Sequence, residues 1–181
     1  MAPVVAELPE PLSASLAQAL PELERTCRQP WWLIGSAALV AWGVPEIICR
    51  DLDILVDIDD AVRLEQVWAA RREHGFVTAN DHLFRSRFAR FTGFSLPVET
   101  MGGLHLNVAG CWQAVIPSDR QCLATPAGEL YLPSLPALIE ILDAFGRDKD
   151  IDKARRARAW LAGAPELPES RSAPATPSSP E

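Results

Sequence analysis

Two aspartates separated by one residue, Asp51 and Asp53, are the residues of this chain best suited to do chemistry. Strand periodicity would point both side chains to one face, and the opposite face is apolar, formed by Leu52, Ile54 and Val56. Two like charges on one face repel each other and are costly to desolvate. A bound divalent cation is the least costly way to keep both ionised, so the pattern favours a metal site.

A Gly-Ser pair stands upstream of the aspartates. Gly35 and Ser36 follow an apolar segment, residues 31–34, that we expect to form a strand, and they lead into a short Ala-rich helix over residues 37–42. Backbone N–H groups at a helix N-terminus bind phosphate, and the Ser36 hydroxyl can join them or simply cap the helix. Taken alone, the aspartates would also fit a solvated strand edge. The Gly-Ser pair makes a metal site the better interpretation.

A third carboxylate on a later strand would complete such a site. Glu99 is the best candidate, because strand-forming residues flank it and Gly102-Gly103 follow it. Glu129 is the comparable competitor, in a more peripheral neighbourhood, and an ordinary surface position for Glu99 remains the alternative.

This layout of strand, Gly-Ser, helix, strand with Asp-x-Asp, helix and further strands resembles the nucleotidyltransferase superfamily. The matching residues are Gly35-Ser36, Asp51-Leu52-Asp53 and Glu99, and Arg50 directly before the aspartates is also typical of that superfamily. The resemblance covers residues 31 to about 101. Residues 146–150 resemble the segment after the core in small bacterial members, which include aminoglycoside and lincosamide nucleotidyltransferases and toxin–antitoxin branches.

The resemblance implies an α/β fold of the α+β type, with a mixed β-sheet, flanking helices and a short helical C-terminal extension. It also implies two Mg²⁺ ions, roughly 3.5–4 Å apart in such sites, held by Asp51 and Asp53. Glu99 would ligate the ion that activates the acceptor hydroxyl or help to deprotonate that hydroxyl. The nucleotide-binding residues would be Gly35, Ser36, Arg50 and Lys149.

The implied reaction moves a nucleoside monophosphate from an NTP, with ATP expected, to a hydroxyl acceptor and releases pyrophosphate. The acceptor would be a small molecule or a macromolecule. The alternative from another class is a non-catalytic NTP-binding or protein-binding member of the fold, such as one component of a toxin–antitoxin pair. Nucleotide addition to RNA ends is a third possibility, and the acidic net charge counts against it.

The apolar spacing predicts the elements that must position these residues. A helix over residues 12–28 is either kinked or divided at Pro21. Asp59 is expected to cap a helix over residues 61–74 that ends at Gly75. Strands are then expected over residues 82–88, 94–101, 104–108, 112–116 and 129–132.

Two helices are expected to close the domain. Ser134 would cap the first, which ends at Phe145 before Gly146, and a strongly basic helix would follow over residues 148–161. We expect one domain over residues 12–162, with its core in 31–132 and its C-terminal helices in 134–162. Residues 1–11 would be flexible, and the Pro- and Ser-rich residues 163–181 would be a disordered tail.

Composition excludes several classes of protein. The 181-residue chain has a net charge of −7, which argues against non-specific nucleic-acid binding. No apolar run approaches membrane-spanning length and no signal-peptide pattern opens the chain, so we expect a cytoplasmic protein without a membrane partner. The scattered cysteines are expected to be reduced and mostly buried: Cys27, Cys49, Cys111 and Cys122.

Overall fold

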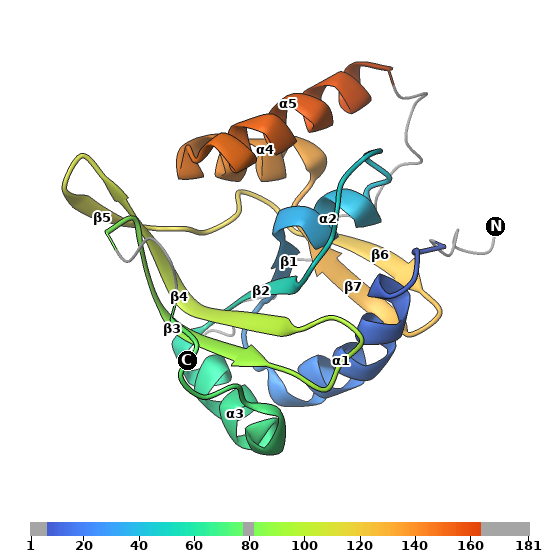
Figure 1. The fold of residues 1–181 in the computed structure, drawn as a ribbon, viewed down its shortest axis with the longest axis vertical. Coiled ribbons are helices and arrows are strands. Elements are labelled where there is room, and N and C mark those ends of the chain that lie inside the picture. Colours follow the sequence, from blue (N-terminus) through green and yellow to red (C-terminus); the bar gives the residue numbers. More distant parts are fainter. Residues whose placement is uncertain (1–6, 78–81, 164–181) are drawn as a thin grey trace, which may run out of the picture.

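The computed structural model describes residues 7–77 and 82–163, and Figure 1 shows their arrangement. A five-stranded sheet has the order β1-β2-β4-β3, and β5 pairs with the last residues of β4, on the edge opposite β3 and past the end of β2. Strands β2 and β4 are parallel and the other neighbours are antiparallel. The strands are β1 (Trp32–Ile34), β2 (Leu52–Val56), β3 (Phe84–Phe91), β4 (Val98–Val108) and β5 (Cys111–Ala114). The expected mixed sheet is therefore confirmed.

One face of this sheet rests on two helices, α1 (Leu12–Thr26) and α3 (Ile58–Val67). The sheet side chains on this face are fully or almost fully buried: Leu52, Ile54, Val56, Ala89, Phe91 and Val98. The buried carboxylate of Asp60 on α3 accepts hydrogen bonds from the backbone N–H groups of Arg28 and Gln29, which ties the end of α1 to α3. This apolar layer leaves the other face of the sheet available for polar side chains.

The other face lies below three helices, α2 (Gly35–Ala41), α4 (Leu135–Phe145) and α5 (Asp148–Gly163) (Figure 1). Ser134 caps α4 by accepting from the Ala137 N–H, and Gly146 ends α4 in the left-handed conformation, both as predicted. A second sheet of two strands, β6 (Gln121–Thr125) and β7 (Gly128–Leu132), packs beside β1 and α1. None of the helices in the described ranges is long and apolar enough to cross a membrane.

Strand β4 bends halfway along its length. Arg85 pairs with His105 and Arg87 pairs with Gly102, so two residues of β4 lie opposite one residue of β3. Gly103, in that interval, has φ +58°, which is the geometry of a β-bulge with glycine in the left-handed region. The bulge turns the far ends of β3 and β4 toward the start of α5, as Figure 1 shows. We had expected two separate strands, but β4 runs through both glycines.

Gly102 explains why the strand continues. A β-carbon at Gly102 would lie 2.6 Å from the Cβ of Ala61, so glycine there permits close packing of β4 on α3. The expectation that the glycine pair separates two strands was therefore wrong.

Several helix boundaries also differ from expectation. Pro21 lies inside one continuous helix, which ends at Thr26. Helix α3 begins at Ile58 with Asp57 as its cap, because the Asp57 carboxylate accepts from the Asp59 N–H. It ends at Val67 and a 3-10 helix, Ala69–Arg71, follows, so the predictions of Asp59 as the cap and Gly75 as the C-terminal cap were wrong.

Three smaller expectations need correction. Helix α2 begins at Gly35, and Ile34 occupies its cap position, so Ser36 does not cap it. Strand β6 was not expected at all. The four cysteines are free, as expected, but Cys111 is exposed and the other three are half-buried. Residues 1–6 of the expected flexible N-terminus and residues 164–181 of the expected disordered tail lie outside the described residues.

Candidate active site

Three carboxylates lie on neighbouring strands at one place on the open face of the sheet. Asp53 in β2 is directly opposite Glu99 in β4, and Asp51 immediately precedes β2 on the same side. All three side chains are half-buried. The alternation predicted for Asp51 and Asp53 is confirmed, because Leu52 and Ile54 between and after them are fully buried on the opposite face.

Gly35 lies against this carboxylate group. Ile34 pairs with Asp53 across β1 and β2, so the chain turns into α2 directly beside the Asp53 side chain. A β-carbon on residue 35 would be 2.4 Å from Asp53 Oδ2, and Gly35 has φ +66°. Glycine at this position therefore makes room for the Asp53 carboxylate.

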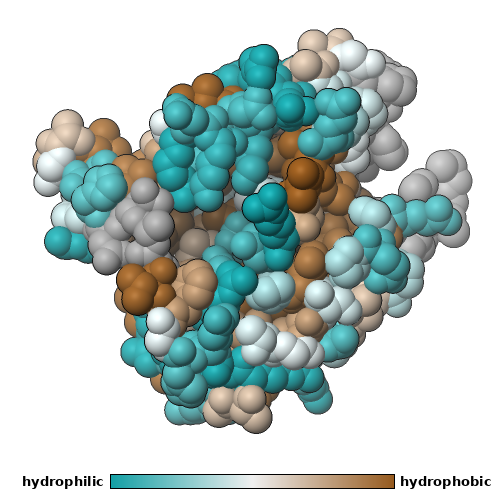
Figure 2. Space-filling model, in the orientation of Figure 1, coloured by the Kyte–Doolittle hydropathy of each residue, from teal (hydrophilic) through white to brown (hydrophobic). Residues whose placement is uncertain are grey.

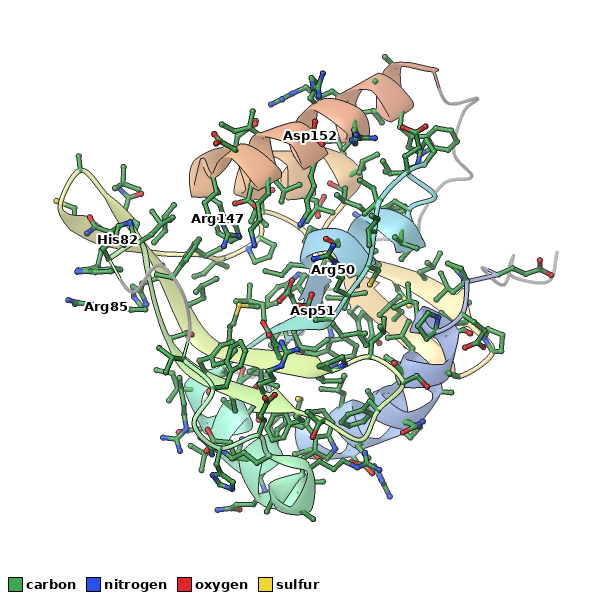
Figure 3. All side chains as sticks on the ribbon, in the orientation of Figure 1. Arg50, Asp51, His82, Arg85, Arg147 and Asp152 are labelled. Carbon is green, nitrogen blue, oxygen red and sulfur yellow. The ribbon has the colours of Figure 1, made fainter. Side chains whose placement is uncertain are left out.

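The carboxylates open into a cavity of about 1100 Å³. Its floor is the open face of β2, β3 and β4, and its roof is the end of α4 and the first two turns of α5. Figure 2 shows hydrophilic side chains over α5 with a hollow below them, and in Figure 3 Arg147 and Asp51 lie on facing sides of that hollow. This volume is close to the upper end of the roughly 300–1,000 Å³ that is usual for small-molecule pockets.

Two lysines face the carboxylates from the roof. Lys149 and Lys153 are four residues apart on α5, so they share a helix face, and they are the only lysines of the chain. Both line the cavity, where Lys149 is exposed and Lys153 is half-buried. Burial lowers the pKa of Lys153, and the nearby Lys149 lowers it further, whereas Asp150 and Asp53 raise it. The cavity therefore combines an acidic floor with a basic roof.

The crowding of negative charge on the floor changes the acidity of its carboxyl groups. Burial raises the pKa of Asp53 from 3.8 to about 7, and the charges of Asp51 and Glu99 contribute to that rise. Burial and Asp51 likewise raise the pKa of Glu99, against the opposing effect of Arg90. Strongly raised carboxyl pKa values in a cavity are typical of functional sites, because a fold without such a role has no need to keep a destabilised charge.

Arg90 is the cation that already contacts this floor. It lies opposite Glu99 in the β3–β4 pairing, and its Nη1 donates to Glu99 Oε1. The same nitrogen is 3.9 Å from Asp51 Oδ2, and Nε is 3.0 Å from Glu73 Oε2. Within residues 7–77 and 82–163, no three His, Cys, Asp or Glu side chains are arranged to hold one metal ion together.

Some of the predicted site residues line the cavity and others do not. Gly35, Asp51, Asp53, Glu99 and Lys149 all line the cavity. Ser36 has a buried side chain and is not among the residues that line the cavity, and neither is the exposed Arg50. The competitor Glu129 lies on β7 in the second sheet, bonded to Tyr131, outside the cavity. Of the two candidates, Glu99 is the one beside the aspartates.

Sequence reasoning missed Arg90 and Lys153. The spacing of Lys153 from Lys149 was the available signal, because residues four apart share a helix face. Arg90 offered no such signal. Its position follows from the pairing of β3 with β4, which the sequence does not reveal.

The chain was compared with known proteins. No family model matches it, and no curated protein matches its sequence. Among solved structures, a proposed nucleotidyltransferase from Thermotoga maritima has a TM-score of 0.59 at 20% identity, covering 81% of this chain and 92% of that one. The lincosamide antibiotic adenylyltransferase LnuA, bound to lincomycin, has a TM-score of 0.51 at 13% identity, covering 84% of this chain and 98% of that one.

The chain has the nucleotidyltransferase fold. At these identities the likeness concerns the backbone, so the chemistry of the site must be argued from the residues themselves. In this nucleotidyltransferase fold, the Gly-Ser turn, the Asp-x-Asp strand and the strand of Glu99 are adjacent, as the sequence resemblance implied.

The donor set suits a hard divalent cation. Mg²⁺ prefers carboxylate oxygens and phosphates, and the floor offers three carboxylates whose mutual repulsion such an ion would relieve. Asp51 and Asp53 are open to the cavity, and Glu99 is beside them but paired with Arg90. The side chains therefore fit the ion in chemical kind and share one wall of the cavity, but Glu99 is paired with Arg90 and no three acids in the described ranges converge on one ion.

Proposed function

We propose that this protein is a Mg²⁺-dependent nucleotidyltransferase that moves a nucleoside monophosphate from an NTP, with ATP as the expected donor, to a hydroxyl acceptor. The observation that carries the proposal is the alignment of Asp53 with Glu99 across β2 and β4, beside Asp51 and under the lysines of α5. An acidic floor for metal ions and a basic roof for phosphates are the two requirements of phosphoryl transfer, which depends on positioning and charge stabilisation.

Each residue has a role that follows from its place. Asp51 and Asp53 would hold Mg²⁺, which would supply charge stabilisation at the attacking and leaving oxygens. Glu99 would complete that site or accept the proton of the acceptor hydroxyl. Lys149 and Lys153 would bind the triphosphate from the roof, and Gly35 keeps space beside Asp53. Roles for Ser36 and Arg50 in nucleotide binding stay predictions.

The size of the cavity is consistent with two substrates. An NTP laid between the α5 lysines and the carboxylates would leave the far part of the cavity, along β3 and β4, for the acceptor. His105 is six positions after Glu99 on β4, about 20 Å along the path of the strand, which the bulge at Gly103 bends.

The test is calorimetric binding of ATP, with and without Mg²⁺, to the wild type and to Asp51→Asn/Asp53→Asn. We expect Mg²⁺-dependent binding that the double variant loses and that a chelator abolishes. Asp143→Asn is the matched control, because Asp143 is an exposed acid on α4 that pairs with Arg158. Failure of a well-folded wild type to bind any NTP would contradict the proposal.

The pairing of Glu99 with Arg90 favours a second candidate function. A protein whose third carboxylate stays engaged would bind NTP without turnover and serve as a nucleotide-binding or protein-binding module, for instance within a toxin–antitoxin pair. Release of pyrophosphate from ATP in the presence of candidate acceptors separates the two. Sustained release of pyrophosphate supports the nucleotidyltransferase. Tight binding of Mg²⁺–ATP without pyrophosphate release, across a broad set of acceptors, supports the non-catalytic module.

A further inference from the structure

Arg90 is shared between two groups of acids that belong to different parts of the molecule. Its Nη1 contacts Glu99 and approaches Asp51, both on the candidate metal floor. Its Nε bonds instead to Glu73, which lies in the segment of residues 72–77 that runs beside β3. Because different nitrogens serve the two groups, Arg90 can lose the Glu99 contact and keep the Glu73 contact.

The 72–77 segment is built to hold Arg90 in place. The Glu73 N–H donates to the Arg90 carbonyl at 2.8 Å, and Arg72 forms a bridge with Phe91. The Arg90 guanidinium lies 4.7 Å from the ring centroid of Phe76, which is itself stacked on Phe88. The guanidinium thus has a carboxylate and an aromatic face on the segment side, enough to keep it satisfied without Glu99.

We propose that Arg90 is a positioning residue that competes with the divalent cation for Glu99, and that Glu73 is its alternative anchor. This inference rests on the proposed function, since it takes Asp51, Asp53 and Glu99 as the metal ligands. Glu99 Oε1 accepts from Arg90, so an ion that approaches this oxygen competes with the guanidinium for it. The positive charge of Arg90 beside Glu99 and Asp51 also repels a second cation, and for both reasons Arg90 lowers the affinity of the site for the ion.

The test measures metal affinity without any reaction. Mn²⁺ is the probe, because it accepts the same oxygen ligands as Mg²⁺ and its unbound fraction is read by electron paramagnetic resonance. Arg90→Gln should bind Mn²⁺ about tenfold more tightly than the wild type, the equivalent of one charge-assisted hydrogen bond. Glu73→Gln should bind Mn²⁺ more weakly than the wild type, because Arg90 then depends more on Glu99.

Arg87 and Asp143 supply the controls. Arg87 is on the same strand as Arg90 and also lines the cavity, but it bonds to Glu65 on α3. Arg87→Gln is the control for Arg90→Gln, and Asp143→Asn, which removes an exposed acid paired with Arg158, is the control for Glu73→Gln. Both report the general electrostatic effect, which salt screens. Each Arg90 or Glu73 result is therefore compared with the corresponding control.

The outcomes separate this inference from the proposed function. Tighter Mn²⁺ binding in Arg90→Gln together with weaker binding in Glu73→Gln, each beyond its control, supports competition for Glu99. Mn²⁺ binding by the wild type with equal or weaker affinity in Arg90→Gln overturns the inference and leaves the metal site intact. No Mn²⁺ binding by the folded wild type overturns both. If Arg90→Gln does not fold, Glu73→Gln still tests the inference: weaker Mn²⁺ binding than in its control supports competition for Glu99, and equal or tighter binding overturns it.

Discussion

Gly35 and Asp53 are so close that a β-carbon on residue 35 would lie 2.4 Å from Asp53 Oδ2. The turn from β1 into α2 and strand β2 are therefore one unit, in which the identity of residue 35 constrains the position of the Asp53 carboxylate. The glycine of the Gly-Ser motif and the second aspartate of Asp-x-Asp act together in this chain.

The first prediction follows from that contact. Gly35→Ala should destabilise the fold by about 1–3 kcal/mol, because alanine is strained at a positive φ, and should displace the Asp53 carboxylate. We expect it to abolish Mg²⁺-dependent ATP binding, as measured by calorimetry, with stability followed by urea unfolding. Gly110→Ala is the control, since Gly110 has φ +87° and no atom within 4 Å of its would-be β-carbon. Equal effects of the two substitutions would refute the role of the Asp53 contact.

The second prediction concerns Glu99. Glu99→Gln should reduce turnover by about 10²–10⁴-fold, the usual contribution of a positioned base, and keep the fold and most of the ATP affinity. Steady-state pyrophosphate release gives the turnover and calorimetry gives the affinity. The control is Glu129→Gln on β7, which lies outside the cavity and should leave both quantities unchanged. Unaltered turnover in Glu99→Gln would show that Glu99 is not the third carboxylate.

The third prediction concerns pH. Asp53 has its pKa raised from 3.8 to about 7, chiefly by burial, so the folded state holds this proton more tightly than the unfolded chain. The contribution of Asp53 to stability is therefore full below pH 3.8 and is lost as the pH rises through about 7. Asp53→Asn should remove this loss. The stability of the variant relative to the wild type, measured as the difference between their free energies of unfolding, should therefore be greater at pH 8 than at pH 5.

Urea unfolding at the two pH values, in the presence of a chelator, measures this difference. A variant whose relative stability is the same at pH 5 and pH 8 would contradict the raised pKa. Mg²⁺ added at pH 8 should recover stability in the wild type and not in Asp53→Asn, because a bound cation stabilises the folded state by mass action.

The fourth prediction uses the two lysines. Because Lys149 and Lys153 are the only lysines and both line the cavity, reductive methylation followed by mass spectrometry reports on the roof of the cavity. ATP with Mg²⁺ should protect both residues. Lys153→Met should weaken ATP binding by about tenfold, in line with one hydrogen bond to a charged group. Methylation of both lysines at the same rate with and without Mg²⁺–ATP would exclude them as phosphate ligands.

Local patterns were enough to predict the parts of the fold that local interactions control. Strand alternation predicted the shared face of Asp51 and Asp53, and cap chemistry predicted Ser134 at the start of α4 and Gly146 at its end. The Gly-Ser pair and the Asp-x-Asp motif, within the expected order of strands and helices, were the basis of the nucleotidyltransferase resemblance, which the solved structures confirm at the level of the fold.

The predictions that failed depend on contacts between distant segments. Gly102 looked like the end of a strand, yet it allows β4 to pack on Ala61 of α3. The error at the start of α3 is local instead: the Asp59 N–H donates to the Asp57 carboxylate, so the cap lies two residues before the predicted Asp59. Arg90 joined the site only through the register of β3 against β4. Such registers follow from the packing of the whole sheet, which no single window of sequence contains.

The bulge at Gly103 has a consequence for how this protein could evolve. Glu99 lies before the bulge and His105 after it, so a single strand carries both the carboxylate and the far wall of the cavity. The far wall ends in the β4–β5 hairpin, where Trp112 stacks under Arg85. Substitutions in that hairpin would remodel the distant half of the cavity while the register of Glu99 with Asp53 stays fixed. The reaction and the choice of acceptor would then be able to diverge independently within one strand.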